Sequence, residues 1–104
     1  MWIYTVSGFY SIVEDRDDPD LLLVRARVKG DIQRLWPQAE VAFTPDHDYA
    51  YRCLLPRRIV GHAVSEAIKK VGYHSYKDAV RDKRRSIDYL KVWTAMVEMQ
   101  SVLE

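Results

Sequence analysis

Two arginines spaced one residue apart on an apolar strand are the side chains of this chain best suited to bind a ligand. Residues 21–28 read Leu-Leu-Leu-Val-Arg-Ala-Arg-Val. Because side chains alternate across a strand, we expect Arg25 and Arg27 to project from the same face, roughly 7 Å apart. Two guanidinium groups at that spacing can grip two phosphates or an acidic partner side chain. The opposite face is predicted to be core and carries Leu22, Val24, Ala26 and Val28.

A second stretch, residues 49–55, supplies two aromatic rings and a third arginine. If its strand lies near the first, its tyrosines could stack on an exposed base or anchor a protein partner beside the arginines. The alternative is a solvated sheet face whose charges pair across the strands. The predicted binding residues are Arg25, Arg27, Asp48, Tyr49, Tyr51 and Arg52.

A second group of basic residues lies nearer the C-terminus. Three aspartates, Asp78, Asp82 and Asp88, are interspersed with it. Mixed charges of this kind favour a solvated helical face, with a polyanion-binding patch as the alternative. The basic residues are Lys77, Arg81, Lys83, Arg84 and Arg85.

Residues able to do catalysis or bind metal are present but poorly spaced for either. The triplet Asp46-His47-Asp48 consists of adjacent residues, which cannot all point at one ion, so a turn with solvated charges is favoured. The acidic loop 15–20 lacks the glycine and distal glutamate of a calcium loop. His62 and His74 have no acid or nucleophile nearby in the sequence, and Cys53 is predicted to be a small buried thiol. We therefore predict no catalytic residue, no metal ligand and no cofactor.

Composition limits the classes of partner and compartment. The chain has 104 residues, a size typical of one domain, and we expect a single domain over residues 1–104. Sixteen basic and fifteen acidic residues give a net charge of +1, so no global field attracts nucleic acid or anionic lipid. The single cysteine excludes an intrachain disulfide and suits a reducing compartment. Without a signal peptide or an apolar run of membrane-spanning length, we expect a soluble, cytoplasmic protein.

The periodicities predict the element order β-β-β-α-β-β-α-α. This order indicates an α+β two-layer domain, with an antiparallel sheet of about five strands and helices on one face, and a ferredoxin-like arrangement is one version of it. Gly8 is expected to take the positive φ of a hairpin turn, and Asp31 to cap a short helix. The predicted segments are a hairpin over 2–13, strands over 21–28, 41–44 and 49–55, and helices over 31–36, 56–71 and from 76 onward, the last interrupted or solvated at 81–85.

Helical periodicity also predicts which side chains cover the sheet. Apolar residues of the three helical stretches recur at the spacing of a buried stripe. The residues expected to be largely buried are Trp36, Val64, Ile68 and Trp93.

Four segments of the chain belong together in one further argument. They are Trp2-Ile3-x-Thr5-x-x-Gly8-Phe9-Tyr10-Ser11-Ile12-Val13, Val24-Arg25-Ala26-Arg27, Thr44-Pro45-x-x-Asp48-Tyr49-x-Tyr51-Arg52 and Tyr76-Lys77-x-Ala79-Val80. With these segments the chain resembles a family of small bacterial proteins of about this length, some of them carried by phages or other mobile elements. The resemblance implies an intracellular bacterial or phage origin and draws attention to the predicted binding residues, but it brings no activity with it. The chain departs from the family pattern at 81–86, where a glutamine-glycine turn is expected.

Three functions follow, in order of preference. The first is a non-enzymatic module that binds a protein partner through its arginine and tyrosine face, in regulation or in phage-host conflict. The second is an RNA-binding or single-stranded nucleic-acid-binding protein that uses the same face. The third is a small hydrolase or metal-dependent enzyme with residues assembled from distant positions. The oligomeric state is left open.

Overall fold

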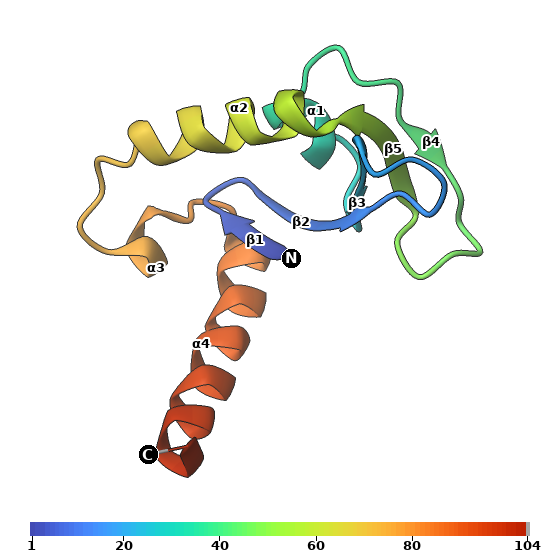
Figure 1. The fold of residues 1–104 in the computed structure, drawn as a ribbon. Helices are drawn as coiled ribbons and strands as arrows, with labels where there is room; N and C mark the ends of the chain where they lie inside the picture. Colours follow the sequence, from blue (N-terminus) through green and yellow to red (C-terminus); the bar gives the residue numbers. More distant parts are fainter. Residues whose placement is uncertain (104) are drawn as a thin grey trace. The chain divides into compact units, whose positions relative to one another are not determined.

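The computed structural model describes residues 1–103, which fall into two compact units. The first unit, Met1–Gly72, contains the whole sheet with helices α1 and α2, and the second begins at Tyr73 and contains α3 and α4 (Figure 1). The expectation that residues 1–104 form one domain stays a prediction.

Five antiparallel strands make up the sheet of the first unit. Its strand order is β1-β2-β3-β5-β4, and every neighbouring pair is antiparallel. The predicted α+β two-layer class with a five-stranded antiparallel sheet is therefore confirmed. The ferredoxin-like version is not the one observed, because β1, β2 and β3 follow one another with no helix between them. The strands are β1 (Trp2–Thr5), β2 (Gly8–Glu14), β3 (Leu21–Ala26), β4 (Ala42–Phe43) and β5 (Tyr51–Pro56).

Helices α1 (Asp31–Leu35) and α2 (Arg57–Lys69) pack on one face of this sheet, which we call the inner face. Trp36, which follows α1, is 4% exposed, so its predicted burial is confirmed. Val64 is half-buried against the core, whereas Ile68 is 67% exposed and its predicted burial is wrong. The reason is that the packing of α2 on the core ends at Val64. The core consists of Tyr10, Ile12, Val24, Ala26, Ile32, Trp36, Cys53 and Val60.

The structural role of Gly8 in the hairpin differs from the predicted one, which was to take the positive φ of the turn. Gly8 begins β2 directly after the turn, and its φ is not positive. The ring of Tyr10, which is fully buried, lies against its backbone, so that a Cβ at Gly8 would come within 2.7 Å of ring atom Cζ. Gly8 is therefore required for close packing and not for turn conformation.

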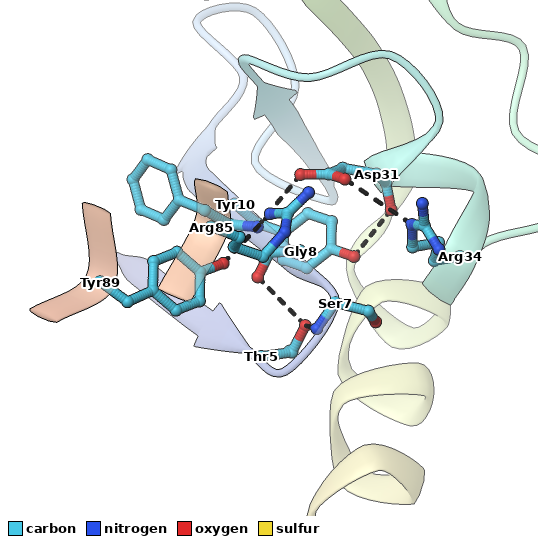
Figure 2. A network of polar contacts seen from close by, with 9 residues as sticks. Thr5, Ser7, Gly8, Tyr10, Asp31, Arg34, Arg85 and Tyr89 are labelled. Carbon is cyan, nitrogen blue, oxygen red and sulfur yellow. Dashed lines mark hydrogen bonds and ion pairs between the residues drawn. The ribbon is translucent and has the colours of Figure 1, made fainter. Parts of the chain in front are cut away.

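The start of α1 also differs from the prediction. Gly30, with φ 90°, is the N-cap, and Asp31 is the first helical residue. The Asp31 carboxylate is almost completely buried, where it accepts a hydrogen bond from the Phe9 backbone N–H at 3.3 Å and lies 3.7 Å from Arg34 Nε. The Tyr10 hydroxyl donates to the Asp31 carbonyl at 2.7 Å (Figure 2). Asp31 thus fastens α1 to β2.

Strand β3 is shorter than predicted, so one residue that was predicted to lie in the core lies outside the sheet. It ends at Ala26, and the chain then turns, with the Asp31 N–H donating to the Val28 carbonyl at 3.2 Å. Val28 consequently lies outside the sheet and is half-exposed, so its predicted place on the core face is wrong. Arg27 is likewise a loop residue.

The second unit holds the short helix α3 (Tyr76–Ala79) and the long helix α4 (Lys83–Leu103). Residues 80–82 interrupt the helical stretch, and the Asp82 carboxylate caps α4 by accepting the Arg85 N–H at 2.8 Å. Trp93 is 49% exposed, so its predicted burial is wrong. None of the helices within residues 1–103 has both the length and the apolar character needed to cross a membrane.

Candidate functional site: the outer face of the sheet

The side of the sheet away from α1 and α2, here called the outer face, collects most of the predicted binding residues. The register aligns Trp2 with Ser11, Ser11 with Arg25, and Arg25 with Arg52 across four strands. Since paired residues point to the same side, these four side chains form one row. The outer face comprises Trp2, Tyr4, Phe9, Ser11, Val13, Leu23, Arg25, Arg52 and Leu54 from the strands, with Arg27 and Tyr49 from the adjoining loops.

Tyr49 is the buried centre of this face. It is 5% exposed, and its ring lies 4.7 Å from the guanidinium carbon of Arg25 and 4.1 Å from that of Arg27. The Phe9 ring is 6.5 Å away at 45°. Guanidinium groups on an aromatic ring gain electrostatic attraction from its π face, by about 0.5–1 kcal/mol at exposed sites. Tyr49 therefore positions two of the predicted arginines.

Asp48 holds the second of these arginines from the loop before β5. Arg27 Nη1 donates to the Asp48 backbone carbonyl at 2.8 Å and lies 3.2 Å from its carboxylate oxygen Oδ1. The Arg27 side chain is 48% exposed, and that of Asp48 is 77% exposed. Asp48 thus neutralises part of the positive charge of the face and ties its two loops together.

Arg25 and Arg52 carry charge that no carboxylate neutralises within residues 1–103. Arg25 Nη2 donates to the Ser11 hydroxyl at 2.8 Å, and Arg25 Nε is buried without a hydrogen-bond partner among the described residues. Arg52 faces Arg25 across the β3–β5 pair and contacts His47 Nδ1 through Nη1. Like charges placed directly opposite each other repel. This pair is the part of the outer face that an acidic group would complement best.

An aromatic cluster borders the arginines on β1 and β2. The Tyr4 ring stacks on the Phe9 ring at 4.5 Å, and Trp2 meets Phe9 edge-on at 6.1 Å. Burial raises the pKa of the Tyr4 phenol, and Tyr49 adds to this rise while Arg27 opposes it. Trp2 remains 68% exposed. The face therefore combines two stacked rings, Tyr4 and Phe9, with the indole of Trp2, which is open to solvent.

Tyr51 does not join this face, although it is one of the predicted binding residues. It pairs with Ala26 on the inner side, packs against the core and stacks on Phe43 at 5.2 Å. Strand alternation separates it from its neighbour Arg52. Of the predicted residues, Arg25, Arg27, Asp48, Tyr49 and Arg52 come together.

Sequence reasoning missed the contribution of the N-terminal hairpin to this face. Trp2, Tyr4 and Phe9 alternate with core residues, a pattern visible in the sequence. Their proximity to the arginines depended on the pairing of β2 with β3, which periodicity alone does not give. The sequence favours a turn with solvated charges at Asp46-His47-Asp48 and does not predict the contact between His47 and Arg52.

Cys53 lies on the inner face and not at the site. It is buried in the core, and burial raises the pKa of its thiol to about 11. The thiolate, which is the nucleophilic form, is therefore scarce at neutral pH. This environment fits a packing role for Cys53.

The second predicted patch lies in the other unit, and three of its five cations have local partners. Lys77 Nζ sits 4.5 Å from the Trp93 ring centre, and Arg84 Nε lies 2.9 Å from the Asp88 carboxylate. The hydrogen bond from Arg84 lowers the pKa of Asp88, against some desolvation and with help from Lys91. Arg85 donates to the Tyr89 hydroxyl at 3.2 Å. These contacts make this segment a helical face of paired charges, as the interspersed aspartates indicate, while Arg81 and Lys83 are exposed.

The chemistry open to the outer face is recognition of charge and aromatic surface. Within residues 1–103, no three His, Cys, Asp or Glu side chains are grouped so that they could hold a metal ion. The arginines offer fixed positive charge and paired N–H donors, and the exposed Trp2 ring and Leu54 side chain offer apolar area.

Comparisons with protein-family models, with curated proteins and with solved structures found no match to this chain. A function for it therefore has to be proposed from the residues of the outer face themselves.

Proposed function

We propose that this protein is a non-enzymatic interaction module that binds a protein partner through the outer face. The observation that carries the proposal is the row formed by Trp2, Ser11, Arg25 and Arg52, in which an exposed indole and two guanidinium groups without ion-pair partners among residues 1–103 lie side by side. The complementary partner surface carries carboxylates opposite the arginines and an apolar patch opposite the tryptophan.

The composition of the outer face supports a protein partner. It contains three arginines and four aromatic residues but no lysine or glutamate. Protein interfaces are enriched in arginine and aromatic residues and depleted in lysine and glutamate. Val13 and Leu54 are exposed on the same face, next to the arginine row, and supply apolar area. Tyr49 and Phe9 hold the arginines in place, which reduces the entropy lost on binding.

Binding of RNA or single-stranded nucleic acid is the second candidate, and one observation favours it. Trp2 is exposed in the same row as Arg25 and Arg52, so a base could stack on the indole while the arginines contact phosphates. Two features weigh against it. Tyr49 is buried beneath two guanidinium groups and is therefore not open to a base, and the net charge of the chain is only +1. No observation on the described residues favours a hydrolase or a metal-dependent enzyme.

The setting we propose is the cytoplasm of a bacterium, with a role in regulation or in phage-host conflict. A free, buried thiol at Cys53 is in keeping with a reducing compartment. The resemblance to small bacterial and phage proteins supports the origin, and it stays a proposal.

Partner capture with a charge-matched control tests the proposal. The site variant carries Arg25→Gln and Arg52→Gln, and the control carries Arg16→Gln and Arg58→Gln, which remove the same charge from exposed positions off the outer face. Tagged wild-type and variant proteins are compared in nuclease-treated lysate, and captured proteins are identified and then measured against purified protein. We expect the wild type and the control to bind the same partner, and the site variant to bind it at least about tenfold more weakly.

Two outcomes contradict the proposal. Equal binding by all three proteins means that the partner contacts another surface. Loss of the partner on nuclease treatment, together with micromolar binding of the wild type to a single-stranded oligonucleotide and a steep salt dependence, supports the nucleic-acid candidate instead. Thermal melting of each variant shows that the substitutions leave the fold intact.

A further inference from the structure

Helix α4 presents an apolar surface that its own unit leaves open. No residue of α4 is buried, and eight of its large apolar side chains are each at least 46% exposed, while Val92 is half-buried. From Lys91 to Leu103, the polar residues other than Gln100 fall in one stripe, which consists of Lys91, Thr94, Glu98 and Ser101. A helix that is apolar over most of its circumference normally lies within a core or an interface. The exposed apolar residues are Ile87, Leu90, Trp93, Met96, Val97, Met99, Val102 and Leu103.

The spacing of this apolar surface indicates what kind of element covers it. Val92, Met96, Met99 and Leu103 follow one another at intervals of four, three and four residues. Alternating intervals of three and four form the seam by which one helix packs against another helix, with side chains of one inserted between those of its partner. We call these four residues the α4 seam. Leu90, Trp93 and Val97 follow one another at intervals of three and four and form a second apolar row on a different side of the helix.

The distribution of charge along α4 indicates which helix packs against the α4 seam. Residues 83–93 contain four basic residues and one acidic residue, whereas residues 94–103 contain one acidic residue, Glu98, and no basic residue. Two parallel copies would place the two basic halves side by side. Two antiparallel copies place each basic half beside the acidic half of the other, and they also oppose the helix dipoles favourably.

We propose that α4 is a self-association helix, which pairs in antiparallel orientation with α4 of a second copy of this chain through the α4 seam. Each copy supplies the same seam, so one two-fold axis satisfies both helices and closes the assembly as a dimer. This inference rests on α4 alone and is independent of the function proposed for the outer face. A dimer would carry two outer faces and bind a multivalent partner with increased avidity.

The test is the mass of the full chain in solution as a function of concentration. Sedimentation equilibrium from low micromolar to near-millimolar protein should show a reversible transition from one chain to two. The site variant, Met96→Glu with Met99→Glu, places two carboxylates in the seam and should weaken dimerisation at least about tenfold. The control, Thr94→Glu with Ser101→Glu, adds the same charge at exposed positions away from the seam and should remain dimeric.

The salt dependence tests the orientation separately. An antiparallel pair is held partly by attraction between basic and acidic halves, so added salt should weaken it, and Glu98→Lys should weaken it further. A parallel pair has its basic halves together, so salt would strengthen it and overturn the proposed orientation. A mass of one chain at every concentration, or equal dimerisation by the seam variant and the control, would overturn self-association through α4. Circular dichroism of each variant reports whether α4 keeps its helix.

Discussion

The two faces of the sheet are built from the same strands, but different interactions hold them together. The inner face buries apolar side chains under α1 and α2, with Trp36 edge-on to the Tyr10 ring at 5.5 Å. On the outer face, Arg25 and Arg27 instead lie against the Tyr49 ring, and Asp48 joins the two loops. Burial of apolar area contributes more to folding than exposed ion pairs and cation–π contacts do. The inner face therefore contributes most of the folding free energy. The residues of the outer face can then be selected for binding and not for stability.

This difference matters for function because residues that add little to folding can change without unfolding the chain. The repulsion between Arg25 and Arg52 across β3 and β5 is a cost that folding does not require. Residues that lower the stability of the fold are commonly found at binding surfaces. The comparison of the two faces can be tested through substitutions that differ only in the face they affect.

The largest effect is expected from two tryptophans on opposite faces. Trp36→Ala removes a buried ring and the hydrogen bond from its Nε1 to the Ile59 carbonyl at 3.3 Å, so unfolding free energy should fall by about 3–5 kcal/mol. Trp2→Ala removes an exposed ring and should cost less than about 1.5 kcal/mol. Urea unfolding followed by circular dichroism measures both, with Trp36→Phe as a folded comparison. Equal costs for the two alanine variants would mean that the faces do not differ as described.

A glycine pair gives the next largest effect. Gly8→Ala forces a methyl group against the buried Tyr10 ring and should destabilise by about 1–3 kcal/mol. Gly61→Ala adds the same methyl group in α2, where nothing lies within 4 Å, and should stabilise by up to about 1 kcal/mol because alanine favours helix. Thermal melting of the two variants gives shifts of opposite sign. A neutral Gly8→Ala would show that the Tyr10 ring can move away from the backbone of Gly8.

The sequence predicts the inner face well and the outer face only in part. Alternation along β3 and helical spacing around Ile32 and Trp36 identify core residues because both signals are local. The approach of Tyr49 to Arg25 depends on a loop that brings residues 24 positions apart together, and no local pattern encodes it. The same is true of Arg57, whose guanidinium pairs with Glu14 at 2.8 Å and with the Pro19 carbonyl, and so fixes the acidic loop to α2.

Failures of the sequence reading follow one physical pattern. Ile68 and Trp93 have the spacing of a buried stripe but are exposed, because periodicity shows that a helix has an apolar side and not what covers it. Tyr51 was assigned to the arginine face by composition, although alternation with Arg52 already separates the two. Gly8 and Asp31 were recognised as special positions, but the buried contacts that explain them involve distant residues.

A smaller effect is expected from pH, and it concerns the inner face alone. The folded-state pKa of Cys53 is raised to about 11 by burial, so the unfolded chain loses its thiol proton first as pH rises. Above the ordinary thiol pKa the unfolded state therefore binds fewer protons than the native state, and stability falls until pH passes about 11. The slope attributable to one thiol is at most about 1.4 kcal/mol per pH unit.

The measurement is a difference between two proteins, since tyrosines titrate in the same range. The stability of the wild type minus that of Cys53→Ala should decrease between about pH 8.5 and pH 11 and stay constant below pH 8. A constant difference across the whole range would mean that the thiol is open to solvent in the folded protein.

The smallest effect is expected from the ion pair that closes the outer face, and it tests the comparison most directly. Arg27 and Asp48 are both substantially exposed, so water and salt screen their attraction, and ordering the two side chains opposes it. A double-mutant cycle with Arg27→Gln and Asp48→Asn should give a coupling energy of about 0.2–1 kcal/mol, which decreases as salt is added. Arg27→Gln also removes a cation from the Tyr49 ring and a donor from the Asp48 carbonyl, so the single variant should cost somewhat more than Asp48→Asn. A coupling of several kcal/mol that is insensitive to salt would place this pair in a dry interior, and the outer face would then be part of the folding core and not a surface kept for a partner.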